Sequence, residues 1–270
     1  MSEPVPLRTL EDGFSIDCLM VALPVASRLE FAKASIQRFK AQTYLNKRLV
    51  IVINGGDDHV GQTLCDYARA QDEGDIEVVY PEGNLSLGAL RNISLEHVSA
   101  DVFCQWDDDD LYHPLRLADQ AKVLREGGFE AVYLEDLIQY FPAQQALYWT
   151  NWRATSVGGH PGTLMARYSP GLAYPSSGDE AKLGEDTVLA QAFLSRGRVG
   201  YLGGAAHLYL YVSHGANSWN DDHHLMLARE LSISKALLLR RQPQLTDGLV
   251  PYNLPAGTVV RGSNGDAFTL

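Results

Sequence analysis

Cysteine is scarce in this chain of 270 residues, and the cysteines that it has lie far apart. They are Cys18, Cys65 and Cys104, with no CxxC pair among them. This spacing excludes a disulfide framework and a cysteine zinc site and favours a reducing compartment, so we expect a cytoplasmic protein. The sequence has no apolar run near the roughly 18 residues of a spanning helix, and its N-terminus lacks the pattern of a signal peptide. We therefore expect a soluble protein, with peripheral binding at a membrane surface still compatible.

Basic residues are also in short supply. The chain has 22 Lys and Arg against 33 Asp and Glu, which gives a net charge of −11. No block of Lys or Arg offers the footprint of a nucleic-acid-binding surface, so we expect no nucleic-acid partner. Hydrophobic residues make up 46% of the chain and charged residues 20%. This composition excludes a disordered chain and is enough for one large domain with a sizeable core.

The first half alternates short apolar runs with segments of helical periodicity. The apolar runs predict strands at 16–23, 49–53, 76–80 and 101–106, and the periodic segments predict helices at 29–44, 60–68 and 87–98. This order is typical of βαβ units, and it predicts an α/β fold with a Rossmann-like, mostly parallel central sheet flanked by helices. Ligands bind such sheets at the carboxyl ends of the strands. We expect four loops to converge there, at 24–28, 54–57, 81–88 and 107–110.

The second half has a different pattern. Strand-like runs at 131–142 and 146–152 predict a hairpin, and further strands are expected at 163–168, 199–203 and 207–212. Helical stripes predict a helix around 188–193 and a long amphipathic helix over 222–240. Residues 241–270 contain three prolines and little periodicity, so we expect a tail or arm. The chain thus reads as a single domain over 1–240 with a mixed second half.

The most informative segment is WDDDDLYHP at 106–114. Four consecutive aspartates at the end of a buried strand repel one another, so something positive is expected beside them. Carboxylates without nearby cysteine are hard oxygen ligands that suit Mg²⁺ or Mn²⁺. The alternative is a solvated acidic turn before a helix that begins near His113 and Pro114. Asp110 is expected to face away or to cap that helix.

Five segments together resemble a known family: LPVASR at 23–28, VINGG at 52–56, GNLSLGALRN at 83–92, WDDDDLYHP at 106–114 and GED at 184–186. The chain resembles the family 2 glycosyltransferases of the GT-A fold over roughly residues 16–215. The resemblance implies a nucleotide-binding half at about 16–110 and an acceptor-binding half at about 111–240. It also implies that Asp109 ligates Mn²⁺ or Mg²⁺ on the diphosphate of a nucleotide sugar, with Asp107 and Asp108 close to the donor. The further donor-binding candidates are Pro24, Arg28, Asn54, Gly88 and Arg91, although Arg91 could equally be a surface arginine.

The GEDT segment at 184–187 is the second acidic signal. A carboxylate pair that opens a helix is favoured by the helix dipole, so N-capping alone could explain it. The resemblance implies instead that Glu185 and Asp186 form the catalytic pair, with Asp186 as the general base that deprotonates the acceptor hydroxyl. A carboxylate can serve because deprotonation accompanies attack on a strongly electrophilic carbon.

Three further side chains have both a functional and a plain structural interpretation. His160 lies in GGHPG, where glycines allow close approach to a ligand, and it either contacts the donor or closes a turn. His214 follows the last expected strand, and the resemblance makes it a candidate metal ligand, although a surface histidine is the common case. Trp219 is our candidate acceptor-binding residue, as a platform for a sugar face, or it fixes a helix to the core.

We therefore predict a metal-dependent, inverting glycosyltransferase that uses a nucleoside-diphosphate sugar and a saccharide or other hydroxyl acceptor. Many family members carry an acidic pair after the second strand, where this chain has Ile53 and Asn54. UDP is our first choice of nucleotide, with GDP and dTDP open. A nucleotidyltransferase and a catalytically inactive sugar-nucleotide binder are the alternatives. The QxxRW motif and spanning helices of processive members are absent from the sequence, and a homo-oligomer is compatible with it.

Overall fold

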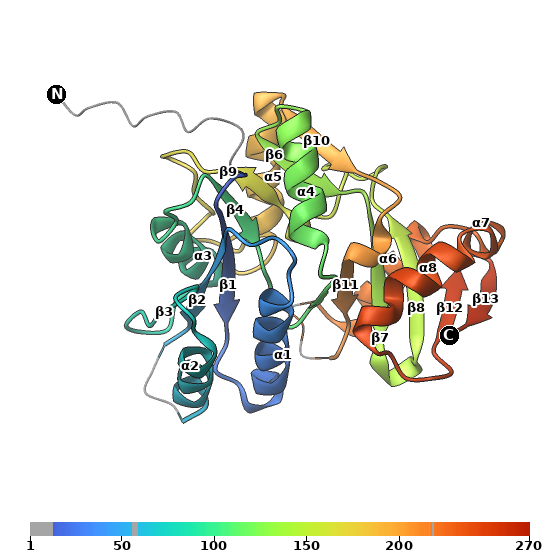
Figure 1. The fold of residues 1–270 in the computed structure, drawn as a ribbon, viewed down its shortest axis with the longest axis horizontal. Helices are drawn as coiled ribbons and strands as arrows, with labels where there is room; N and C mark the ends of the chain where they lie inside the picture. Colours follow the sequence, from blue (N-terminus) through green and yellow to red (C-terminus); the bar gives the residue numbers. More distant parts are fainter. Residues whose placement is uncertain (1–12, 56–58, 216, 218) are drawn as a thin grey trace.

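Two mixed β-sheets form the framework of the chain in a computed structural model, which describes residues 13–55, 59–215, 217 and 219–270 (Figure 1). The strands of the first sheet are β1 (Ile16–Ala22), β2 (Lys47–Ile53), β3 (Ile76–Val79), β4 (Val102–Gln105), β6 (Ala131–Leu134), β9 (Met165–Arg167) and β10 (Val199–Leu202). Their order is β10-β6-β9-β4-β1-β2-β3. Neighbouring strands are parallel except at β9, which runs antiparallel to β4 and β6. This confirms the predicted α/β fold with a mostly parallel sheet.

Helices cover both faces of this first sheet. One face packs against α1 (Leu29–Lys40), α2 (His59–Gln71) and α4 (Arg116–Glu126), and the other against α3 (Leu87–Glu96) and α5 (Glu185–Arg196). Alternate residues of β1 serve the two faces, since Cys18 and Met20 join the core of the first face and Leu19 that of the second. Burial on both faces explains why β1 is a continuous apolar run.

The second sheet is built from strands within residues 111–269 and lies beside the first (Figure 1). Its strands in the described chain are β5 (Leu111–Tyr112), β7 (Asp136–Phe141), β8 (Ala146–Asn151), β11 (Tyr209–Val212), β12 (Val259–Gly262) and β13 (Gly265–Thr269). Their order is β13-β12-β8-β7-β11-β5. Helices α7 (Lys235–Arg240) and α8 (Gln242–Leu249) pack on one face and α6 (Asp221–Leu231) on the other. Short 3-10 turns link the elements: η1 (Ala26–Arg28), η2 (Pro142–Gln144), η3 (Pro161–Thr163), η4 (Ala206–Leu208) and η5 (Val250–Tyr252).

Two predicted elements are divided in the structure. The run 131–142 becomes β6 and β7, which belong to different sheets, while β7 and β8 form the predicted hairpin. The helix predicted over 222–240 is interrupted between α6 and α7. There the Ile233 N–H donates to the Trp149 carbonyl of β8 (3.1 Å) and the Ser234 side chain caps α7. Pairing with the sheet therefore outweighs helical periodicity at this point.

The prediction of a tail or arm at 241–270 is wrong. These residues form α8, η5, β12 and β13, and β12 pairs in parallel with β8. Leu245, Leu249, Tyr252 and Val260 are buried in the core between α8 and the second sheet. The prolines lie at helix starts and connections, where they do not interrupt this packing. In the residues that the structure describes, we find no helix long and apolar enough to cross a membrane.

Candidate active site

A cavity of about 330 Å³ lies at the carboxyl ends of β1, β2 and β4. All four loops that the sequence predicted to converge contribute to it, through Arg28, Asn54, Leu85 and Asp107. The parallel strand arrangement explains this, because β1, β2 and β4 end at the same edge of the sheet. Residues 56–58 of the expected turn after β2 lie outside the described residues.

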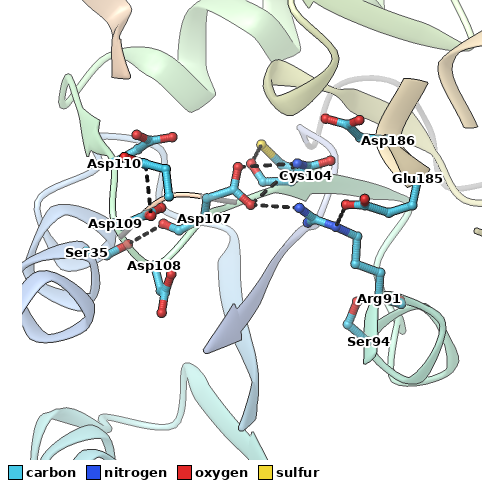
Figure 2. Close-up of polar contacts among 12 residues, drawn as sticks. Ser35, Arg91, Ser94, Cys104, Asp107, Asp108, Asp109, Asp110, Glu185 and Asp186 are labelled. Carbon is cyan, nitrogen blue, oxygen red and sulfur yellow. Dashed lines mark hydrogen bonds and ion pairs between the residues drawn. The ribbon is translucent and has the colours of Figure 1, made fainter. Parts of the chain in front are cut away.

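The first aspartate of the acidic run is held from both its backbone and its side chain. The Asp107 carbonyl accepts hydrogen bonds from the Ser35 hydroxyl (2.9 Å) and the Tyr112 hydroxyl (3.0 Å). Its carboxylate accepts from Arg91 Nη2 at 3.1 Å, and Figure 2 shows the two side chains pointing at each other. Asp107 is thereby fixed on the side of the cavity that faces α3 and α5.

Arg28 binds the next two aspartates together. Its Nη2 atom lies 2.5 Å from Asp108 Oδ1 and 2.7 Å from Asp109 Oδ2. Burial and the charge of Asp109 raise the pKa of Asp108 to about 7. Burial also acts on Asp109, but the hydrogen bond with His214 and the charge of Arg28 hold its pKa below the usual range. Arginines thus supply positive charge that the four aspartates led us to expect.

Asp110 neither faces away nor caps a helix, so that expectation is wrong. Its carboxylate accepts hydrogen bonds from the Val212 N–H (2.8 Å) and from the Tyr209 hydroxyl. Burial and the charge of Asp109 raise its pKa well above the usual value. Helix α4 begins later, at Arg116, with no side-chain cap from Leu115. Asp110 therefore ties the acidic run to β11 of the second sheet.

The two carboxylates of the GED segment point in different directions. Helix α5 begins at Glu185, after Gly184 takes the left-handed conformation (φ 87°). Glu185 Oε1 accepts a hydrogen bond from Arg91 Nε at 2.8 Å, whereas Asp186 is turned away from this pair (Figure 2). Arg91 is consequently buried between Asp107 and Glu185 and is not a surface arginine.

Of the two carboxylates at the start of α5, Glu185 forms the ion pair with Arg91 and Asp186 does not. Asp186 lines the cavity. It accepts a hydrogen bond from the Thr187 N–H at 2.7 Å. Burial and the neighbouring charge of Glu185 raise its pKa to about 6. A carboxylate of that pKa is ionised at neutral pH and still basic enough to take a proton.

His160 lies where the cavity at the strand ends meets a second cavity of about 250 Å³. Its backbone carbonyl closes the turn into η3, so the plain structural role is fulfilled by the main chain. The imidazole packs edge-on against Trp152 with ring centroids 4.5 Å apart, and its Nδ1 atom is buried without a hydrogen-bond partner. Burial lowers the pKa of His160 to about 3, so the ring is neutral. Of the nearby glycines, Gly159 packs against β6 and only Gly162 lines the cavity.

The metal candidates Asp109 and His214 lie together, with Asp109 Oδ2 and His214 Nε2 3.0 Å apart. His214 stacks on Phe31 at 4.4 Å between ring centroids, so it is not a stray surface residue. Among the described residues, no group of three or more His, Cys, Asp and Glu side chains is placed to hold a metal ion. One carboxylate and one imidazole still fit Mn²⁺ or Mg²⁺ chemistry, because such ions usually take one or two carboxylates and complete their shell with substrate phosphates and water.

Of the remaining donor-binding candidates, Asn54 and Gly88 contact other parts of the protein, and Pro24 lines a separate cavity. The Asn54 amide donates to Asn84 Oδ1 (3.1 Å) and accepts from the Leu85 N–H (3.1 Å), so it fastens the loop before α3. Gly88 does not line the cavity but lies against the 175–181 loop, where an added Cβ would be 1.9 Å from the Pro175 carbonyl oxygen. Pro24 lines a neighbouring cavity of about 540 Å³ together with Asn54.

Trp219 is partly exposed (44%) and lines both the cavity at the strand ends and the second cavity, so it does not fix a helix to the core. Its ring stacks on His223 at 4.4 Å. The second cavity also contains Gln139 of β7 and Tyr211 of β11, which sequence reasoning missed. The alternating tyrosines of β11 were the one available signal, since they place Tyr209 and Tyr211 on the same face.

Comparison with known proteins gives a consistent result. The family model described as glycosyl transferase family 2 matches residues 20–163. An uncharacterized glycosyltransferase of Rickettsia bellii is 28% identical over 121 residues, which are 42% of this chain and 17% of that protein. One from Rickettsia typhi is 24% identical over 106 residues, 39% of this chain and 31% of the other. The chain thus spans less than a third of the length of these relatives.

Solved structures resemble the chain over most of its length. TarS 1–349 of S. aureus, in complex with UDP-GlcNAc, covers 89% of this chain with a TM-score of 0.60 at 14% identity, and 68% of TarS 1–349 is matched. The mannosyltransferase PcManGT of Pyrobaculum calidifontis, in complex with GDP-Man and Mn²⁺, covers 90% with a TM-score of 0.53 at 15% identity, and 65% of it is matched. At these identities the likeness establishes the fold.

Proposed function

The chain belongs to glycosyl transferase family 2, and we propose that it transfers a sugar from a nucleoside-diphosphate donor to an acceptor hydroxyl, with inversion at the anomeric carbon. One observation carries the proposal. Asp186 lines both adjoining cavities, one of which contains the acidic run with its arginines, while the other is largely uncharged. This arrangement leaves a place for the donor on one side of Asp186 and for the acceptor on the other.

Asp186 acts as the general base in this proposal. The acceptor oxygen attacks the anomeric carbon while its proton passes to the Asp186 carboxylate, and the bond from that carbon to the diphosphate oxygen breaks. The electron pair of that bond leaves with the nucleoside diphosphate. The raised pKa of Asp186, about 6, supports this role, because a base near the operating pH is both ionised and effective.

Positive charge for the leaving diphosphate comes from side chains around the acidic run. Arg91 is held in place by Glu185 and lines the donor-side cavity, and Arg28 lines it as well. Asp109 and His214 would hold a divalent cation, Mn²⁺ or Mg²⁺, and such a cation when bound supplies further Lewis-acid stabilisation of the leaving group. Charges fixed in advance where negative charge develops are a large source of rate enhancement.

The nucleotide portion of the donor fits the 540 Å³ cavity beside the diphosphate region, lined by Leu23, Pro24 and Val25. UDP is our first choice, with GDP and dTDP as the other candidates. The amide of Asn54 is engaged within the protein, so it offers little for reading a base edge. The buried free cysteines fit the cytoplasmic location that we propose.

A binding and hydrolysis screen tests the proposal. UDP, GDP and dTDP sugars are compared for thermal stabilisation of the protein and for sugar release, each with and without Mn²⁺. We expect one nucleotide class to stabilise the protein with Mn²⁺ and to be slowly hydrolysed. Asp109→Asn should abolish the Mn²⁺-dependent part of this stabilisation, and the exposed Asp222→Asn serves as the control. Failure of every nucleotide sugar to bind would contradict the proposal.

A further inference from the structure

The second cavity has a polar lining that is not satisfied within the protein. It lies next to the donor-side cavity and shares Asp186, His160 and Tyr211 with it. Gln139 of β7 also lines it, and in the pairing of β7 with β11 it is the partner of Tyr211. Its side chain is nearly fully buried (2% exposed), yet Oε1 has no hydrogen-bond partner.

Two side chains that line this cavity, Gln139 and His160, therefore each contain a buried polar atom without a hydrogen-bond partner, Oε1 and Nδ1 respectively. Buried polar groups are nearly always hydrogen-bonded in native proteins, so an unpartnered pair at a cavity wall points to a ligand. An amide oxygen only accepts hydrogen bonds, and a neutral imidazole has one accepting nitrogen. Hydroxyl groups can donate to Gln139 Oε1 and can pair with either tautomer of the neutral His160 ring, whereas phosphate and carboxylate oxygens at neutral pH cannot donate to Gln139 Oε1.

The charge of the cavity points the same way. Within the described chain, its lining includes no lysine or arginine, and Asp186 is the lining residue with a carboxylate. Burial and the neighbouring His223 lower the pKa of His224, which keeps that ring neutral. An anionic group placed here would meet Asp186 without a counter-cation, and a buried charge is unfavourable unless it is paired.

The remaining walls supply aromatic surface. Trp152, Tyr211 and Trp219 all line the cavity. Aromatic side chains are large, rigid contact groups with an apolar face and a polar edge. Such faces suit the C–H side of a sugar ring, while the unpartnered polar atoms suit its hydroxyls.

We propose that the acceptor is a neutral saccharide or polyol, whose hydroxyls next to the reacting one form hydrogen bonds with Gln139 and His160. This inference rests on the proposed function, since it assigns the second cavity to the acceptor of that reaction. Gln139 determines acceptor specificity, and it has no part in donor binding.

The first test compares acceptors. Methyl glycosides of neutral hexoses are offered alongside hexose 6-phosphates and hexuronic acids, with whichever nucleotide sugar the protein hydrolyses. We expect kcat/KM to be at least about tenfold higher for a neutral glycoside than for its anionic counterpart. Equal or better use of the anionic compounds would overturn the inference while leaving the glycosyltransferase proposal intact. Absence of donor binding and hydrolysis would instead reject the proposed function itself, and the inference with it.

The second test changes the cavity. Gln139→Leu should raise the KM for a neutral acceptor about tenfold and shift the donor Kd less than twofold, and Gln144→Leu, exposed in the same hairpin, should change neither. An unchanged acceptor KM in Gln139→Leu removes the assignment of Gln139.

A third variant keeps the inference testable if Gln139→Leu does not fold. Leu227 lines the cavity from α6, whereas its neighbour Met226 is exposed elsewhere on that helix. Leu227→Arg should increase the use of hexose 6-phosphates relative to neutral glycosides severalfold, and Met226→Arg should not. The proposed role of charge would be contradicted if the wild-type protein used anionic and neutral acceptors with equal kcat/KM. It would also be contradicted if Leu227→Arg did not raise kcat/KM for the anionic acceptors.

Discussion

The four aspartates of the acidic run have different partners. Asp107 pairs with Arg91, Asp108 and Asp109 share Arg28, and Asp110 binds Tyr209. Four adjacent carboxylates are therefore four different groups. His214 and Arg28 hold the pKa of Asp109 below its usual range, whereas burial raises the pKa of Asp108 and of Asp110. The sequence predicted that a positive charge is needed here, but not which one. Arg28 is about eighty positions away in the chain, and no local pattern links it to the run.

We predict that the ionisation of Asp186 sets the acidic limb of the rate profile. Burial and Glu185 raise its pKa to about 6, and a protonated carboxyl cannot accept the proton of the acceptor hydroxyl. The kcat should therefore fall as pH decreases through about 6 and should be level above it. The measurement is kcat at saturating donor and acceptor across this range. A limb near the ordinary carboxyl pKa of about 4 would contradict the environment described for Asp186.

A second prediction at this scale separates Glu185 from Asp186. Glu185→Gln weakens the charge that orients the buried Arg91, so donor Kd should rise about tenfold, within the range for losing a charged hydrogen bond. At saturating donor, kcat should stay within a few-fold of the wild-type value. Arg91→Lys should act like Glu185→Gln, raising the donor Kd and leaving kcat at saturating donor within a few-fold of the wild-type value. Loss of kcat at unchanged donor Kd would identify Glu185 as the base instead.

At the level of elements, local patterns predicted what local forces determine. The continuous apolar run of β1 follows from burial on both faces, and the start of α5 follows from its acidic first turn. The two-residue strand β5 carries too little sequence for any pattern. The break between α6 and α7 depends on the Ile233–Trp149 hydrogen bond, which joins distant parts of the chain. Elements that depend on such contacts cannot be predicted from periodicity.

Helix α3 packs closely against the loop at 175–181, and a substitution at Gly88 tests the importance of this contact. Gly88→Ala would place a Cβ 1.9 Å from the Pro175 carbonyl oxygen, and overpacking of this kind costs about 1–3 kcal/mol. The loop continues into Gly184 and α5, so its displacement should lower both Tm and kcat. Glu96→Ala, at the exposed end of the same helix, is the control. Normal Tm and kcat in Gly88→Ala would show that this contact is not needed.

Over the whole molecule, the site forms where the two sheets meet. The cavity that we assign to the donor lies at the carboxyl ends of β1, β2 and β4, and the second sheet adds Tyr211 to its lining. His214, which follows β11, contacts Asp109 at this cavity. The strand pattern predicted the first contribution, because it belongs to βαβ units. The second could not be predicted, since no local signal fixes how the sheets are joined.

The C-terminal residues should be required for folding of the second sheet. Deletion of 241–270 removes β12 from its pairing with β8 and uncovers core residues such as Trp149 and Leu238. We expect a protein that expresses poorly or loses cooperative thermal unfolding, measured by circular dichroism. If the truncated protein has a Tm close to that of the full chain, residues 241–270 are an arm, as the sequence alone had suggested.

The most direct test of the central claim is a paired measurement on Asp186→Asn. A base that acts on the acceptor contributes mainly in the transition state, so its loss changes rate and not donor binding. We predict that kcat for transfer falls about 10²- to 10⁴-fold, the usual scale for general-base loss, while the Kd of the nucleotide-sugar donor stays within about twofold. If the donor Kd rises sharply and turnover at saturating donor persists, Asp186 is a binding residue and the proposed mechanism is wrong.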